Sequence, residues 1–148
     1  MHIHFSDSRP ANASAAILFE VITDYAAYPR FNTAVTDVRI VRQDDEGAEF
    51  VADRRTKIAK RVRAYDRYER HRDLAVERTY QGSPSARSTW TIHPVDGQHS
   101  TLTIDAAQDL PWPVGVVMKP LLRRLFYRIN FTPFIQEAER RAVHARMA

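Results

Sequence analysis

The 148-residue chain contains no cysteine, and this absence excludes a whole set of chemistries. Without thiols there is no disulfide framework, no thiolate nucleophile and no cysteine-ligated zinc or iron–sulfur site. Glycine is scarce as well, with four residues, and no Walker loop, dinucleotide-binding fingerprint or GxSxG motif occurs. We therefore expect no nucleotide-dependent chemistry and no cofactor.

Long apolar runs are also missing. No stretch approaches the roughly 18 uninterrupted apolar residues of a membrane-spanning helix, and the opening MHIHFSDS lacks the basic and apolar regions of a secretion signal. We expect a cytoplasmic protein without a transmembrane segment. Hydrophobic residues make up 44% and charged residues 27%, which is typical of a globular protein, and the length suits a single domain over residues 1–148.

The charge is basic, with a pI near 9.7 and a formal net charge of +4. Because acidic residues are interleaved with the basic ones, we expect solvated faces and no nucleic-acid partner. His2 and His4 share one face of a strand, but no third ligand is identifiable, so we expect no metal site. The sequence does not determine the oligomeric state.

In the first third of the chain, apolar and polar residues first alternate, and apolar residues then recur at helical spacing. Ile3 and Phe5 alternate with polar residues, which predicts a short first strand. Apolar residues at helical spacing predict a first helix from Ser14 to Asp24. Pro29 disfavours helical backbone at the residue before it, so we expect a break or a second short helix before Phe31, and thus a helix pair and not one continuous helix.

From Val35 to Gln108 the chain shows period-2 alternation, with turn residues every 8 to 12 positions or so. The stretches Asp44-Asp45-Glu46-Gly47 and Asp96-Gly97 predict hairpin turns. With the first strand, this pattern predicts an antiparallel sheet of about seven strands.

The last segment, from about Gly115, predicts a long helix. Its apolar stripe comprises Met118, Leu121, Leu122, Leu125, Phe126 and Ile129, and we expect this stripe to face the sheet. Pro133 would free one carbonyl and predicts a kink near Ile129. The part after Pro133, with Glu137, Glu139, Arg140 and Arg141, is expected to turn toward solvent.

This order of elements resembles the START-like (SRPBCC) superfamily. The segment Leu18-Phe-Glu-Val-Ile-Thr-Asp-Tyr-Ala-Ala-Tyr-Pro-Arg-Phe31 is similar to the helix pair of its branch of polyketide cyclases and coenzyme Q-binding START domains. The resemblance covers nearly the whole chain. It implies an α+β helix-grip fold, in which an antiparallel sheet curves around a long C-terminal helix and a cavity lies between them.

The apolar side of each strand should face that cavity. The sequence places there Val38, Ile40, Ala52, Val62, Ala64, Asp66, Leu74 and Ala106, together with the residues expected to bind the ligand. Those ligand-binding candidates are Phe50, Arg54, Tyr68, Val76, Arg78, Tyr80, Trp90, Ile92, Leu102, Ile104, Met118, Leu122, Leu125, Phe126 and Ile129.

Arg54, Asp66 and Arg78 stand out on this apolar face, because an unpaired buried charge is costly. In one interpretation, Arg78 or Arg54 meets the polar head of a ligand, such as a quinone carbonyl or a developing enolate. In the other, which we favour, Asp66 pairs with Arg78 on the neighbouring strand, or the charges reach solvent at strand ends. A slip of one residue would exchange Arg78 for Glu77.

Trp112, between Pro111 and Pro113, is a large aromatic residue in a rigid setting. It could cover the cavity or make transient contact with a membrane. The alternative, which we favour, is a stiff connector whose tryptophan covers the core.

Three functions from different classes remain compatible with these observations. The first, which we favour, is binding or transport of a hydrophobic small molecule such as a lipid, an isoprenoid quinone or a polyketide. The second is a polyketide cyclase or dehydratase acting through Arg78, Tyr80, Tyr68 and Arg54, although no motif identifies catalytic residues. The third is a ribosome-associated interaction protein, which the dispersed charge supports little.

Overall fold

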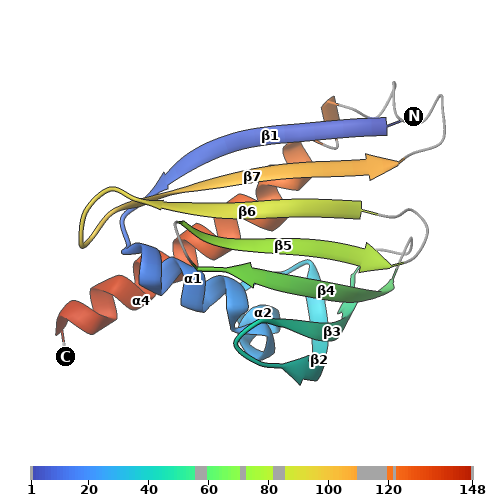
Figure 1. Cartoon of the computed structure of the whole chain (residues 1–148), viewed down its shortest axis with the longest axis horizontal. Helices are drawn as coiled ribbons and strands as arrows, with labels where there is room; N and C mark the ends of the chain where they lie inside the picture. Colours follow the sequence, from blue (N-terminus) through green and yellow to red (C-terminus); the bar gives the residue numbers. More distant parts are fainter. Residues whose placement is uncertain are drawn as a thin grey trace.

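Seven antiparallel strands form one curved sheet, and the helices pack against one of its faces (Figure 1). The computed structural model describes residues 2–55, 60–70, 73–81, 86–109, 120–121 and 123–147. The strands run in the spatial order β1-β7-β6-β5-β4-β3-β2, which confirms the predicted meander. Their bounds are β1 His2–Ala11, β2 Val35–Gln43, β3 Gly47–Arg54, β4 Arg61–Glu69, β5 Leu74–Gln81, β6 Ala86–Pro94 and β7 Ser100–Asp109.

The first strand is longer than we expected. β1 has 10 residues and pairs with β7 along its whole length, from His2 opposite Asp109 to Ala11 opposite Ser100. We expected a short strand, and Pro10, which cannot donate a ladder hydrogen bond, would ordinarily end one. β1 lies at an edge of the sheet, where the missing N–H of Pro10 can face outward, and the strand continues through it.

The predicted helix pair is present. α1 (Ala15–Thr23) begins after Ser14, whose side chain accepts a hydrogen bond from the Ile17 N–H. Its sheet-facing side chains Leu18 and Ile22 are fully buried. The short 3-10 helix η1 (Tyr25–Ala27) and α2 (Tyr28–Phe31) follow, and Pro29 lies in the first turn of α2, where a missing N–H costs little.

Both hairpin predictions are confirmed, and their acidic residues bond the turn backbone. The Asp44 carboxylate accepts hydrogen bonds from the N–H groups of Glu46 and Gly47, and that of Asp96 accepts one from Gln98. Gly47 also permits a close approach between strands. A Cβ at this position would lie 2.0 Å from the backbone oxygen of Asp66 on β4, so a larger residue would displace that part of β4.

The C-terminal helix is irregular where Pro133 predicted an irregularity. Residues 120, 121 and 123–126 are helical, a π-helical turn η2 (Tyr127–Phe131) follows, and α4 (Thr132–Met147) completes the helix. Pro133 cannot donate to the carbonyl of Ile129, four residues earlier. That carbonyl accepts a hydrogen bond from the Asn32 side chain just after α2, with a distance of 3.0 Å.

The burial of this helix reverses our expectation. α4, which we expected to turn toward solvent after Pro133, packs on the fold through Phe134, Ile135, Ala138 and Ala142, all buried. Its Arg141 also bonds Asp24 after α1, with a 2.8 Å distance between Nη2 and the carboxylate. The exposed positions are instead residues 120, 121 and 123–125, which are described just before η2.

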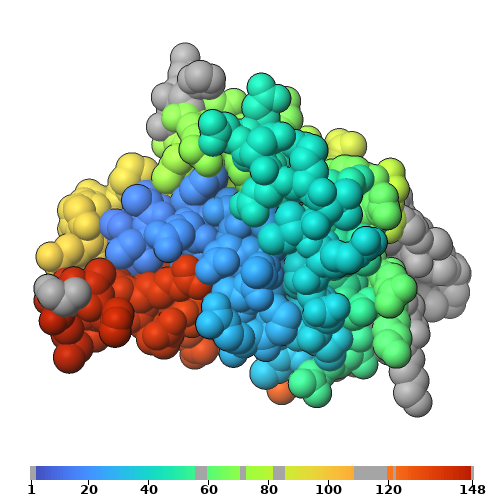
Figure 2. Space-filling view, turned by 90° about the horizontal axis from the view of Figure 1, so that it is seen from below, coloured from blue at the N-terminus to red at the C-terminus, as the bar shows by residue number. Residues whose placement is uncertain are grey.

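The helices form one layer beside the sheet. Figure 2 shows α1 and α2 in blue between α4 in red on one side and β2 in teal on the other. Among the residues that the structure describes, no helix is long and apolar enough to cross a membrane.

Candidate ligand-binding surface

The strand register places the predicted cavity residues on one face of the sheet, which we call the inner face. Phe50 lies opposite Ala64, Asp66 opposite Arg78, and Val76 opposite Trp90. The prediction of which side of each strand faces the helices is therefore confirmed for β3 to β7. Ile40 is the exception in burial, since it is 39% exposed on the edge strand β2, next to a register shift.

Arg78 and Asp66 form a buried ion pair at the centre of the inner face, as in the interpretation that we favoured. Arg78 Nε lies 2.8 Å from Asp66 Oδ1, and Nη2 lies 2.9 Å from Oδ2. Both side chains are almost completely excluded from solvent. This two-point geometry is the strongest form of arginine–carboxylate pairing and compensates both charges.

Two tyrosines of the helix pair complete the hydrogen bonds of the Arg78–Asp66 ion pair. The Tyr25 hydroxyl donates to Asp66 Oδ2 at 2.6 Å and lies 2.7 Å from the Tyr68 hydroxyl. The Tyr28 hydroxyl accepts from Arg78 Nη2 at 2.7 Å and donates to the carbonyl of Ile22. We did not expect a role for these two tyrosines from the sequence. The available signal was their position in a segment packed on the sheet, where buried hydroxyls need partners.

The electrostatics of this network follow from its burial. Burial alone would lower the pKa of Arg78, but the Asp66 carboxylate outweighs it and holds that pKa well above its usual range. Burial raises the pKa values of Tyr25 and Tyr28 above the usual range, and the negative charge of Asp66 adds to this effect. The network therefore holds one compensated charge pair and two neutral phenols over the physiological pH range.

Aromatic rings enclose the ion pair and fill this part of the inner face. The Arg78 guanidinium carbon lies 5.0 Å from the Trp90 ring centre and 5.3 Å from that of Phe50. Phe134 of α4 packs edge-on against Trp90, with ring centres 5.0 Å apart. We call this region the filled half of the inner face, because helices and rings leave its side chains buried.

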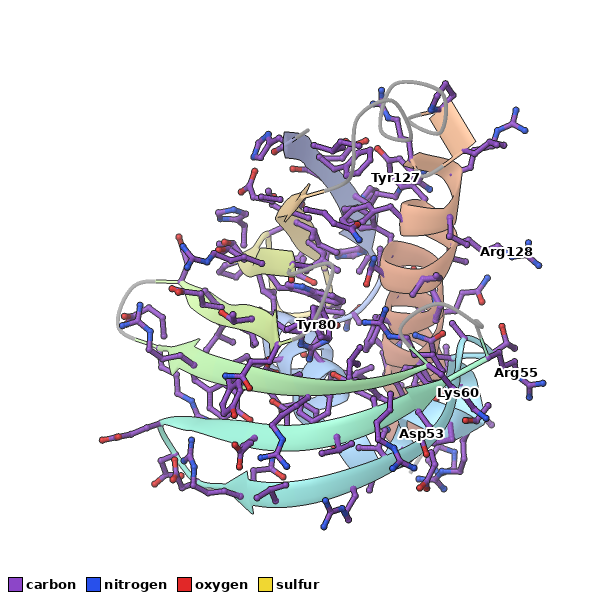
Figure 3. All side chains as sticks on the ribbon, turned by 90° about the vertical axis from the view of Figure 1, so that its right-hand side faces the viewer. Asp53, Arg55, Lys60, Tyr80, Tyr127 and Arg128 are labelled. Atoms are coloured by element: carbon purple, nitrogen blue, oxygen red, sulfur yellow. The ribbon has the colours of Figure 1, made fainter. Side chains whose placement is uncertain are left out.

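The other end of the inner face carries small or partly exposed side chains. Tyr80, Ala86, Ala106 and Gln108 are all partly exposed, and they occupy neighbouring positions of β5, β6 and β7. We call these four residues the open half. In Figure 3, Tyr80 lies in the space between the sheet and the C-terminal helix.

Two aromatic contacts border the open half. Phe126, just before η2, stacks on Phe5 of β1 with ring centres 5.4 Å apart. On the other side, the Arg54 guanidinium carbon lies 4.9 Å from the Tyr80 ring centre. Arg54 forms no ion pair with any residue that the structure describes, so its charge is available at this border.

Arg78 also reaches the boundary between the two halves. Its hydrogen bonds use Nε and Nη2, and Nη1 bonds no residue in the described part of the chain. Beside it in the register lies Ser88, whose hydroxyl accepts from the Trp90 indole at 2.9 Å.

All but one of the fifteen predicted ligand-binding residues divide into three groups. Buried within the filled half or the adjoining core are Phe50, Val76, Arg78, Trp90, Ile92, Leu102 and Ile104. Partly exposed are Arg54, Tyr68, Tyr80, Phe126 and Ile129, of which Tyr68 lies away from the open half, against Phe19. Met118 and Leu122 lie outside the described residues, as does Trp112.

The prediction that Leu125 faces the sheet was wrong, because its side chain is 48% exposed. The same holds for Leu121, which is 58% exposed. Phe126 makes the sheet contact, and at about 100° per residue Leu121 and Leu125 lie roughly 100 to 140° around the helix from it. The predicted stripe was wider than the side that the sheet covers.

Two surface hollows with a defined lining lie at the opposite end of the molecule. One, of about 370 Å³, lies between α1 and the residues at the end of β4 and the start of β5, and it includes Phe19, Arg70 and Leu74. The other, of about 150 Å³, lies between the start of α1, the β6–β7 turn and the end of α4. None of the four residues of the open half lines either hollow.

Comparison with known proteins agrees with this architecture. Residues 2–139 match the model of a family described as polyketide cyclase / dehydrase and lipid transport. The chain belongs to this family. No functionally curated protein matches the chain.

Solved structures share the fold at low sequence identity. A START superfamily protein from Mycobacterium smegmatis is 17% identical, with a TM-score of 0.72 over 98% of this chain and 99% of the other. The ZhuI aromatase/cyclase from Streptomyces sp. R1128 is 14% identical, with a TM-score of 0.70 over 95% and 96%. A STAR-related lipid transfer protein from Xanthomonas axonopodis is 15% identical, with a TM-score of 0.69 over 91% and 85%. At these identities the likeness shows the fold.

Proposed function

We propose that this protein binds a hydrophobic small molecule that carries a polar oxygen, and that the open half of the inner face is its site. One observation carries this proposal. Helices and aromatic rings cover the filled half, whereas Tyr80, Ala86, Ala106 and Gln108 keep accessible surface on the same face.

The chemistry of the open half suits such a ligand. Ala86 and Ala106 leave room next to the sheet, and Phe126 and Tyr80 supply flat apolar walls. Binding sites of this kind combine an apolar lining with a few placed polar groups. Nη1 of Arg78 is one such group, positioned to donate to a carbonyl or carboxylate oxygen. Arg54, at the border, is a second.

This arrangement fits a protein that carries a ligand better than an enzyme that transforms one. Asp66 already compensates the charge of Arg78, and its two-point pairing fixes the guanidinium in one orientation. A rigid cation of this kind can orient a polar oxygen but is a poor proton donor, because an arginine does not deprotonate in proteins. A lipid, an isoprenoid quinone or a polyketide would each offer the apolar body and the oxygen that this site requires.

A polyketide cyclase or dehydratase is the second candidate, and the contact between Arg54 and Tyr80 favours it. A phenol beside a guanidinium that pairs with no described carboxylate could donate a hydrogen bond to an enolate that develops in the open half. In that case purified protein should change the product pattern of a reactive poly-β-ketone, and Tyr80→Phe should abolish the change. No effect of the protein on the products would contradict this second function.

The binding proposal is tested by obstructing the open half. We expect Ala106→Phe to weaken binding of the fluorescent probe 1-anilinonaphthalene-8-sulfonate about tenfold or more, because a phenyl group would occupy the site. Ala107→Phe is the matched control, since the neighbouring residue points to the outer face of the sheet. Protein purified from its own host and examined by native mass spectrometry should carry an apolar molecule, which Ala106→Phe should displace.

Two results would contradict the proposal. Equal probe binding by Ala106→Phe and Ala107→Phe would place the probe elsewhere, for example in the hollow beside α1. Protein that is consistently free of ligand and does not bind the probe would exclude the function itself. Circular dichroism of both variants distinguishes loss of the site from loss of the fold.

A further inference from the structure

The excess positive charge of the protein is concentrated in one segment. Residues 110–136 contain no aspartate or glutamate but carry Lys119, Arg123, Arg124 and Arg128. These are four of the 22 basic residues, so the rest of the chain is balanced, with 18 basic and 18 acidic residues. The charge is therefore less dispersed than we expected from the sequence.

Part of this charge lies on a helix face that also exposes large apolar side chains. Leu121, Arg124, Leu125 and Arg128 follow the spacing i, i+3, i+4, i+7, which places them on one side of a helix. Leu121 is 58% and Leu125 48% exposed, and both arginines are exposed. We call these four residues the Leu–Arg face. Figure 3 shows Arg128 pointing away from the sheet.

The position of this face is also informative. Phe126, on the inner side of the same helix, stacks on Phe5 and borders the open half. The Leu–Arg face is therefore the outer side of the helical segment that covers the proposed binding site. Neither arginine forms an ion pair with a residue in the described ranges, whereas Arg141 of α4 bonds three carboxylates.

We propose that the Leu–Arg face docks the protein on an anionic lipid surface. A helix that presents leucines between arginines lies in the interface of a bilayer, with its apolar side chains at the acyl boundary and its cations at the lipid phosphates. Arginine side chains extend along such a surface while their charges stay among the head groups. Docking would bring the covered site to the surface in which hydrophobic molecules dissolve.

The chemistry favours a bilayer over the other possible occupants. A second copy of this chain, related by two-fold symmetry, would bring four arginines together without an acid to compensate them. The leucines stand on a convex helix surface, which a fluid lipid layer can envelop. Only the delivery of a ligand to the site rests on the proposed function. The docking itself does not.

Vesicle co-sedimentation tests the docking with two kinds of vesicle. We expect binding to vesicles of phosphatidylcholine mixed with phosphatidylglycerol, weak binding to phosphatidylcholine alone, and release at high salt. Arg124→Gln combined with Arg128→Gln should weaken binding roughly 20- to 30-fold, because each arginine near such a surface contributes about fivefold. Leu121→Ser combined with Leu125→Ser should weaken binding about tenfold, through the loss of inserted apolar area.

Matched control variants separate this face from general charge and hydrophobicity. Arg39→Gln combined with Arg87→Gln removes the same charge from exposed positions of the strands. Val41→Ser combined with Val95→Ser removes exposed apolar side chains elsewhere. Both controls should bind vesicles within about twofold of the unmodified protein, since the effect of dispersed charge is small.

Several results would overturn the proposal. These are equal losses in the test and control variants, binding to both kinds of vesicle without distinction, or dimerisation through the leucines without vesicle binding. Salt-sensitive co-sedimentation with ribosomes but not with vesicles would assign the face to another partner. Ala106→Phe should still bind vesicles and the arginine variant should still bind the fluorescent probe, so failure of the docking and failure of the ligand site are distinguishable.

Discussion

The two halves of the inner face lie on the same strands but differ in what the rest of the chain adds to them. In the filled half, Arg78 and Asp66 lie beneath Tyr25, Tyr28 and Phe134, which come from three different helical elements. In the open half, Ala86 and Ala106 keep accessible surface, and the contact between Phe126 and Phe5 borders them. A charged residue on an apolar face is therefore not in itself a sign of a ligand. The hydrogen-bond and ion-pair partners of the charged residue decide whether it is available to a ligand.

The filled half also shows how a buried ion pair is maintained. Removing two charges from water costs several kcal/mol per ion, and their attraction offsets this cost only where further hydrogen bonds satisfy the remaining atoms. Tyr25 and Tyr28 provide those bonds. The comparison predicts that changes in the filled half should affect stability, whereas changes in the open half should affect binding.

The largest effect is expected from Asp66→Asn. The substitution leaves the guanidinium of Arg78 buried without its countercharge, and we expect the free energy of unfolding to fall by about 3 to 5 kcal/mol in urea denaturation. Asp53→Asn is the matched control, because Asp53 pairs with Arg61 at an exposed site, with Nε and Oδ1 2.8 Å apart. Equal stability of the two variants would show that the filled half does not depend on its ion pair.

Truncation of two phenylalanines tests the division directly. Phe134→Ala removes a fully enclosed ring beside Trp90 and should cost about 3 to 4 kcal/mol in the same assay. Phe126→Ala removes a partly exposed ring and should cost about 1 kcal/mol, but it should weaken probe binding more than Phe134→Ala does. The reverse order of either measurement would contradict the division into halves.

Alkaline pH should destabilise the filled half through its tyrosines. Burial raises the pKa values of Tyr25 and Tyr28, so both stay protonated in the folded state while they ionise near pH 10 in the unfolded state. Stability is thus fully present below about pH 9 and should fall by about 2 to 3 kcal/mol between pH 9 and 11.

Absorbance of phenolate provides the measurement. No more than four of the six tyrosines should ionise before the protein unfolds. Tyr65→Phe, on the outer face, should leave the pH dependence of stability unchanged, whereas Tyr25→Phe should reduce it. Ionisation of all six tyrosines in folded protein would disprove the burial argument.

The smallest effect is expected at α4. Hydrogen bonds from Arg140 and Arg141 lower the pKa of Glu137, so its contribution is present above about pH 4.3 and is lost as the pH falls through its folded pKa. Glu137→Gln should cost less than about 1 kcal/mol at neutral pH and should flatten the acid side of the stability profile. Glu46→Gln, at an exposed turn, should do neither. A steeper acid side in Glu137→Gln would reverse the assigned sign.

Local signals in the sequence predicted most of the fold. Alternation gave the inner face of β3 to β7, and the turn residues Asp44 and Asp96 gave the hairpins, because both effects act within a few residues. Ser14 and Pro29 similarly marked the starts of α1 and α2. These parts of the fold depend on backbone chemistry that a few consecutive residues determine.

Contacts between distant residues account for what the sequence did not predict. Tyr25 and Asp66 are 41 positions apart, and Tyr28 and Arg78 are 50 apart, so no local pattern links them. The burial of α4 and the exposure of Leu125 depend on which side of the helix the sheet covers. Ile40 shows the same limit, because it keeps its place in the alternation but lies on an edge strand.

The π-helical turn η2 means that the C-terminal helix contains one residue more than a regular α-helix of the same rotation would need. In a regular helix, the position seven residues before Phe134 would share its side, and that position is Tyr127. Because the turn takes up one extra residue, Phe126, eight residues before, also reaches the sheet and stacks on Phe5, next to Tyr127, whose ring centre lies 4.4 Å from the guanidinium carbon of Arg9. Shortening the chain by one residue within 127–131 should therefore preserve both faces of the helix. A deletion between Phe134 and Ala142 should not, so natural variation in length is expected at the π turn.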